Sequence, residues 1–179
     1  MPAPGKKRVT RLVQAGVIAA MYVVLTMLIP AASFGPVQLR LSEALTVLPV
    51  LTPAALPGLT VGCLLSNLLG MAAGANPGGA WDLLIGPAAT AAAAVLTWLW
   101  RRKTWHGLPL LACLPPVFIN AAVIGTELTL VYLQEFSWPV WWLNLGTVAG
   151  GQAIACLLGG TALHAALTRT GASRLLDDL

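Results

Sequence analysis

Charged residues are nearly absent from the middle of this chain. Between Leu12 and Thr168 there are only eight, and the other charged residues lie at the two ends. Of the 179 residues, 58% are hydrophobic, and the mean hydropathy is +0.81. A soluble domain does not need this much apolar material to fill its core. The sequence therefore predicts an all-α integral membrane protein with a single transmembrane domain over residues 1–179.

The basic stretch KKRVTR and the apolar run after it have the order of a secretory signal. The apolar run is too long for a signal, however, and further apolar runs follow it. We therefore expect a retained first helix. A helix that crosses the bilayer needs about 20 apolar residues, and Leu12–Pro30, Asp82–Trp100 and Pro115–Leu133 all qualify. Pro139–Leu167 is longer than needed, so we expect it to be tilted or to project into the cytoplasm.

The stretch from Ser42 to Met71 is ambiguous because it carries Pro49, Pro53 and Pro57, and a proline breaks the bonding of a helix. Cytoplasmic loops collect Lys and Arg, so KKRVTR and the RRK at 101–103 should lie on one side, with an even number of crossings between them. Two short segments satisfy this condition and one long segment does not. The first, ending at Leu51, is too short to cross alone, so extended chain before it must supply the rest. We predict six transmembrane helices, with cytoplasmic N- and C-termini, at about 10–31, 42–52, 54–71, 81–101, 114–134 and 139–168.

Signatures of catalysis and metal binding are missing from the sequence. It has no phosphate-binding G-x-x-x-x-G-K-[ST] loop and no H-E-x-x-H motif, and His106 and His164 have no ligand spacing. Its three cysteines are scattered through apolar stretches, which is typical of buried small side chains. The basic residues that give the net charge of +4 lie in clusters outside the spans, where they indicate which side of the membrane each loop occupies. We expect no enzyme activity, no cofactor, no metal site and no nucleic-acid partner.

Glu127 lies well inside the fifth expected helix, where a carboxylate costs about 2.5–3.5 kcal/mol on insertion scales and needs a partner or a cavity. Asn120, seven residues earlier, returns to within about 20° of the same helix face. Asn144 and Gln152 lie eight residues apart on the sixth helix, and Trp141 stands at its outer end. These residues are candidate ligand contacts. The alternatives are hydrogen bonds between helices for the polar side chains and an interfacial aromatic belt for the tryptophan.

Arg40 and Glu43 precede and begin the short second helix, with Ser42 as its expected cap. They form either a solvated interfacial ion pair or part of a loop that folds over an outward-facing cavity and contacts a ligand. We expect Asp82 to cap the fourth helix. In the first helix Ala15 and Ala19 form an A-x-x-x-A stripe, which lets another helix approach closely.

Four stretches together resemble the QueT family of substrate-binding subunits (S-components) of energy-coupling factor (ECF) transporters, which are associated with uptake of queuosine precursors. They are FGPVQLRLSEALTVLPVLTPAALPGLTVGCLLSNLLG, WDLLIGPAATAAAAVLT, LPPVFINAAVIGTEL and WWLNLGTVAGGQAIAC. The resemblance covers nearly the whole chain in order. It implies the six-helix S-component fold, a ligand site near the outer face and a prokaryotic plasma-membrane location. It also implies a transmembrane coupling subunit that contacts Ala15 and Ala19, and two ATPase subunits that drive transport.

The ligand that the resemblance implies is a 7-deazaguanine such as the aminomethyl or cyano base, or queuine. Glu127 would accept two neighbouring ring donors, amides such as Asn120, Asn144 or Gln152 would serve either edge, and an indole would stack on the ring. The resemblance implies a glutamate where this chain has Gln152. Because a negative charge is lost there, we expect the site to attract a cationic aminomethyl group less strongly. The expected ligand is therefore an uncharged precursor, such as the cyano base, or another molecule of similar size.

Three other readings remain open. A self-sufficient secondary transporter would couple uptake to protonation of Glu127. A membrane-embedded enzyme would need a nucleophile, base or metal constellation that the sequence lacks. A structural or assembly protein would bind no ligand at all.

Overall fold

Apolar runs of about twenty residues become long helices in the computed structural model, because only a helix satisfies all of its backbone polar groups without water. The structure describes residues 4–133 and 135–177. In chain order the elements are α1 (Pro4–Leu28), α2 (Pro30–Ser33), the 3₁₀ helix η1 (Leu41–Val50), α3 (Ala55–Ala72), α4 (Gly79–Leu99), the 3₁₀ turn η2 (Leu111–Cys113), α5 (Leu114–Leu133), α6 (Trp138–Ala153), the π-helical stretch η3 (Ile154–Gly160), α7 (Thr161–Arg169) and α8 (Arg174–Asp177).

Within these described residues, five helical runs are long and apolar enough to cross a membrane. They are Lys7–Leu28, Ala55–Ala72, Gly79–Leu99, Leu111–Val131 and Trp138–Arg169. The all-α prediction is thus confirmed. The expected end of the fifth helix at residue 134 lies outside the described residues. The last run joins α6, η3 and α7 into one rod of 32 residues.

The second helix lies near its expected position but has 3₁₀ rather than α geometry. Residues 41–50 form a 3₁₀ helix with Pro49 inside it, and at about 2.0 Å per residue it is roughly 20 Å long. That is shorter than the ~30 Å hydrocarbon core, so it is not of span length. Pro49 cannot donate a helical hydrogen bond, and Pro53 follows closely, so a regular α-helix is disfavoured here. η1 instead packs inside the bundle against α1, α4 and η3.

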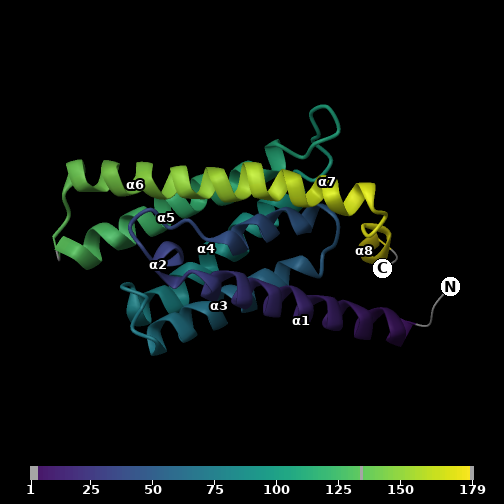
Figure 1. The fold of residues 1–179 in the computed structure, drawn as a ribbon, viewed down its shortest axis with the longest axis horizontal. Coiled ribbons are helices and arrows are strands. Elements are labelled where there is room, and N and C mark those ends of the chain that lie inside the picture. The colour runs from purple at the N-terminus through teal and green to yellow at the C-terminus, as the bar shows by residue number, and fades with distance from the viewer. Residues whose placement is uncertain (1–3, 134, 178–179) are drawn as a thin grey trace.

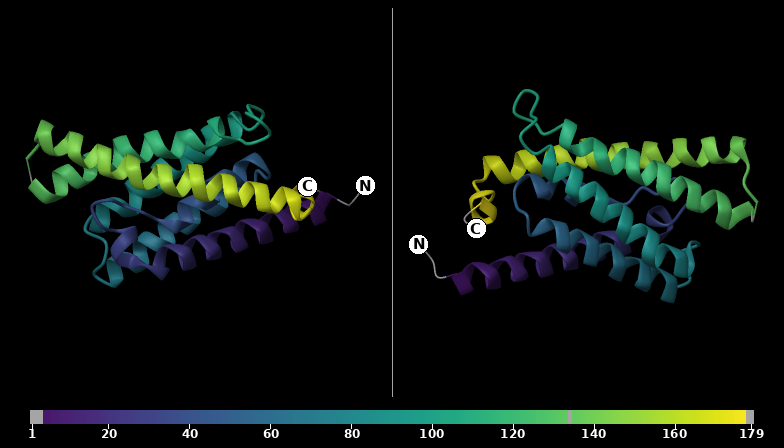
Figure 2. Two further views of the ribbon diagram at one scale, coloured as in Figure 1. Left: turned by 45° about the horizontal axis from the view of Figure 1, so that its top comes forward. Right: turned by 180° about the vertical axis from the view of Figure 1, so that it is seen from behind.

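The ends of the bundle separate the basic clusters from the polar loops. The start of α1, the connection after α4 that carries Arg101 to Lys103, and α8 lie at one end (Figures 1 and 2). α2, the connection from α3 to α4 and the start of α6 lie at the other end, here called the distal end. The two basic clusters therefore share one end, as the sequence predicted. Which side of the membrane this end faces stays a prediction.

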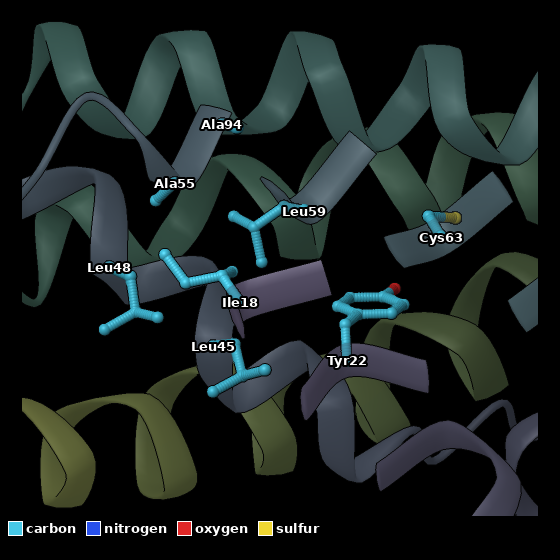
Figure 3. Packing of buried hydrophobic residues seen from close by; sticks show 8 residues of the cluster. All are labelled: Ile18, Tyr22, Leu45, Leu48, Ala55, Leu59, Cys63 and Ala94. Atoms are coloured by element: carbon cyan, nitrogen blue, oxygen red, sulfur yellow. The ribbon is translucent and has the colours of Figure 1, made fainter. Parts of the chain in front are cut away.

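The core lies where α1, η1 and α3 meet. Figure 3 shows Ile18, Tyr22, Leu45, Leu48 and Leu59 in contact within this cluster, with the Tyr22 hydroxyl pointing away from the leucines.

The A-x-x-x-A stripe of α1 serves this packing. A β-carbon added at Gly58 would lie 2.8 Å from the Ala15 carbonyl oxygen, and one at Gly62 would lie 3.1 Å from the Ala19 Cα. Ala19 is buried as a result. The stripe therefore lets α3 of the same chain approach α1 closely, a contact that the sequence analysis did not anticipate.

Substitution of Gly62 by alanine tests this contact. The new β-carbon would lie 2.7 Å from the Tyr22 Cβ, so we expect overpacking to destabilise the protein by about 1–3 kcal/mol. Gly146→Ala is the matched control, because nothing lies within 4 Å of a β-carbon there; it should leave stability unchanged or slightly raised. Thermal unfolding in detergent measures both, and equal midpoints would contradict the close packing of α1 on α3.

Candidate functional site

Four buried side chains from four elements form a hydrogen-bonded group, here called the Glu43 cluster: Tyr22 of α1, Glu43 of η1, Asn120 of α5 and Gln152 of α6. The Tyr22 hydroxyl donates to Glu43 Oε1 at 2.5 Å. Asn120 Nδ2 lies 3.4 Å from Glu43 Oε2 and 3.1 Å from Gln152 Oε1 and donates to both. The group therefore ties the short η1 to three long helices. All four side chains are at most 4% exposed.

Arg40 and Glu43 do not pair with each other, and neither is solvated. Arg40 is 3% and Glu43 is 1% exposed. Arg40 Nη2 instead lies 3.5 Å from Asp82 Oδ2. The expectation of an interfacial ion pair is therefore wrong. The chain runs extended at Arg40, before η1 begins, and this turns the guanidinium toward α3 and α4.

Two expected helix caps are also wrong. Gly78 is the N-cap of α4, four residues before the first acid of that helix, Asp82. The Asp82 carboxylate forms an ion pair with Arg40 and accepts a hydrogen bond from Asn76 Nδ2 at 2.8 Å. Ser42 lies inside η1, whose first flanking residue is Arg40, and its hydroxyl accepts from Thr26 at 2.7 Å.

The guanidinium of Arg40 has further partners. Its Nε donates to the Ser33 carbonyl at 2.9 Å and its Nη1 to Asn67 Oδ1 at 3.4 Å. Asn67 Nδ2 in turn donates to the Asp82 carbonyl at 2.7 Å. The Phe34 ring lies 5.0 Å from the guanidinium carbon, a cation–π distance. We call Arg40, Asn67, Asn76 and Asp82 the Arg40 cluster.

Glu127 makes no hydrogen bond to either cluster. It is 6% exposed, and neither of its carboxylate oxygens has a hydrogen-bond partner among the described residues. A β-carbon added at Gly78 would lie 2.6 Å from Glu127 Oε1 and 2.8 Å from the Asp82 Cβ, so the carboxylate reaches the turn that precedes α4. It lines a cavity of about 530 Å³ between α4 and α5, together with Trp81, Ile85, Leu130 and Val131. Trp81 is 70% exposed, so the cavity reaches the surface.

Trp141 and Asn144 bind α5 directly. The Trp141 indole donates to Thr126 Oγ1 at 2.8 Å, and Asn144 Nδ2 donates to Thr129 Oγ1 at 3.0 Å. Both are hydrogen bonds between helices. For Asn144 this is the alternative considered for the polar side chains, whereas for Trp141 the alternative considered was an interfacial aromatic belt. Of the predicted site residues, the structure brings Glu43, Asn120 and Gln152 into contact. Glu127, Asn144 and Arg40 each have a separate environment.

The sequence analysis missed three residues of these surroundings. Tyr22 and Asn67 carry polar groups inside apolar helices, the same signal that singled out Asn120 and Glu127. Trp81 precedes Asp82 at the start of a span. Only the tertiary arrangement shows that it lies beside Glu127.

Comparison with known proteins identifies the family. The sequence profile described as QueT transporter matches residues 12–169. The chain belongs to the QueT transporter family. One relative is the queuosine precursor transporter QueT of Lactococcus lactis subsp. cremoris (strain MG1363), which is 36% identical over 66 residues; the match covers 36% of this chain and 39% of that protein. The chain thus spans about two fifths of the length of that relative. No solved structure matches.

Membership in the QueT family agrees with the five apolar helices. This QueT-family protein is therefore a multi-pass protein of the cell membrane. Its polar clusters lie inside a bundle whose outer faces carry exposed leucine, valine and tryptophan side chains, as a lipid-facing surface requires.

Proposed function

We propose that this QueT-family protein is the substrate-binding subunit of an ECF-type importer that takes up a queuosine precursor of the 7-deazaguanine class. One observation carries the proposal: Glu127, a buried carboxylate without a hydrogen-bond partner among the described residues, lines a cavity in the distal half of the bundle. A ligand of this class has several N–H donors, and a carboxylate inside a membrane protein needs donors. The sequence has no nucleotide-binding loop, so separate ATPase subunits supply the energy.

In this proposal the other site residues have different tasks. Trp141 and Asn144 hold α6 against α5, which forms one wall of the Glu127 cavity. Glu43, Asn120 and Gln152 join η1 to the same two helices. Arg40 fixes the loop before η1 to α3 and α4.

The coupling subunit would bind along α1. Ala19 is buried against α3, whereas Gly16 and Ala20, one step round the helix, are exposed. A partner helix would therefore meet Gly16 and Ala20 first, beside the half-buried Ala15. This face provides the small-residue surface that close helix packing needs.

A second candidate is a self-sufficient transporter that couples uptake to protonation of Glu127. The absence of any partner for Glu127 among the described residues favours it. Cells that express the chain with and without the coupling and ATPase subunits separate the two candidates. We expect accumulation of labelled base only with those subunits, whereas uptake by the chain alone would favour proton coupling.

Binding itself is tested on the purified protein. We expect mass spectrometry of small molecules released from detergent-purified protein to find a 7-deazaguanine. A protein that neither retains nor binds any base of this class would contradict the proposed function.

A further inference from the structure

The buried charges at the distal end do not balance. Among the described residues of this region, one arginine and three acids are buried, each at most 6% exposed. They are Arg40, Glu43, Asp82 and Glu127. One cation therefore faces three carboxylates. Buried charges require partners, because water is not there to solvate them.

Two of the three carboxylates have their donors inside the chain. Glu43 accepts from Tyr22 and Asn120, and Asp82 accepts from Asn76 and pairs with Arg40. Glu127 alone of the three has no donor for either oxygen among the described residues. Glu127 is thus the buried carboxylate that no donor in this part of the chain stabilises, and it lines the cavity.

The cavity walls suit a positively charged group. Ile85, Leu130 and Val131 are apolar, so the field of the Glu127 carboxylate is weakly screened there. Trp81 adds an indole, the aromatic side chain that attracts cations most strongly. The single arginine is not available to Glu127, because it is already engaged by Asp82, Asn67 and Ser33.

We propose that Glu127 binds a primary ammonium group of the ligand, so that the site selects the positively charged member of its ligand class. This inference rests on the proposed function and specifies it: the aminomethyl base binds with its ammonium at Glu127, and the uncharged cyano base binds more weakly. It reverses the expectation drawn from Gln152, because that amide is already engaged by Asn120 and the negative charge is supplied by Glu127.

The test compares two bases that share the ring and differ in the side chain. Affinities of purified wild-type protein and Glu127→Gln for the aminomethyl and cyano bases are measured by calorimetry. An ammonium–carboxylate contact predicts that the wild type prefers the aminomethyl base and that Glu127→Gln weakens it about 10- to 100-fold. The cyano base should change by less than about threefold, since its contacts do not include the lost charge. Glu135→Gln removes an exposed acid of the same size and should change neither affinity.

The other outcomes have distinct meanings. Equal losses for both bases would overturn the inference, because they would place the shared ring edge on Glu127. An unchanged aminomethyl affinity in Glu127→Gln would overturn it as well. If the wild type binds neither base, the proposed function fails, and if it binds both equally, only the ammonium assignment fails. A matching thermal midpoint for Glu127→Gln shows that the variant is folded.

Discussion

Replacement of Arg40 by methionine should destabilise the protein by about 3–5 kcal/mol, the range found when one partner of a buried ion pair is removed. The variant leaves the Asp82 carboxylate buried without its cation, 3.5 Å from where the guanidinium stood. It also leaves the Ser33 carbonyl and Asn67 Oδ1 without their donors. Methionine keeps an apolar stem in place of that of arginine, so the loss is one of charge, hydrogen bonding and the cation–π contact with Phe34. Thermal unfolding in detergent measures the effect.

A second substitution separates charge from packing. The double variant Arg40→Met with Asp82→Asn removes the orphaned charge, so it should be more stable than Arg40→Met alone by about 1–3 kcal/mol. Arg102→Met removes an exposed cation and is the control, for which we expect a change within about 0.5 kcal/mol. An Arg40→Met protein as stable as the wild type would show that the ion pair does not support the fold.

The long helices could be predicted because they depend on local composition. A run of about 20 apolar residues favours a helix in a membrane because a helix satisfies its own backbone. α3, α4 and α5 lie within two residues of their expected bounds, whereas α1 begins six residues before its expected start. The geometry of the short η1 was harder to predict, since proline disfavours a regular α-helix without specifying what replaces it. Its 3₁₀ geometry depends on packing against α1, α4 and η3.

The partners of the polar residues could not be predicted to the same extent. Arg40 and Glu43 are three residues apart, and this closeness suggested a pair, yet Arg40 pairs with Asp82, which comes from another helix. The chain direction at Arg40 decides this outcome, and no local pattern encodes it. The contact between Asn120 and Gln152 likewise depends on how α5 and α6 are placed against each other.

Glu127 and Asn120 of α5 show that a shared helix face does not predict shared partners. Their spacing of seven residues placed them on one face, and both are buried. Yet Asn120 reaches Glu43 and Gln152, whereas Glu127 reaches the turn before α4. Neighbouring helices cover different parts of that face, so residues on one stripe meet different partners.

Glu43→Ala should have the second large effect, a destabilisation of about 3 kcal/mol or more. The substitution leaves the Tyr22 hydroxyl buried without its acceptor and removes one of the two acceptors of the Asn120 amide. A buried group that loses its partner costs about 1–3 kcal/mol. A small void adds to this cost. Glu43→Gln should cost less, because its carbonyl oxygen can still accept from Tyr22. Glu135→Ala, at an exposed acid, is the control and should leave the unfolding midpoint unchanged.

A double-mutant cycle with Tyr22→Phe shows whether the cluster acts as one unit. If the 2.5 Å hydrogen bond accounts for much of the loss, the double variant Tyr22→Phe with Glu43→Ala should lose less stability than the sum of the two single variants, by about 1–3 kcal/mol. Additive losses would mean that Glu43 stabilises η1 through Asn120 and packing alone. Such coupling would explain why a carboxylate is placed in a helix too short to span the membrane, since it would join η1 to α1 in addition to the Thr26–Ser42 hydrogen bond.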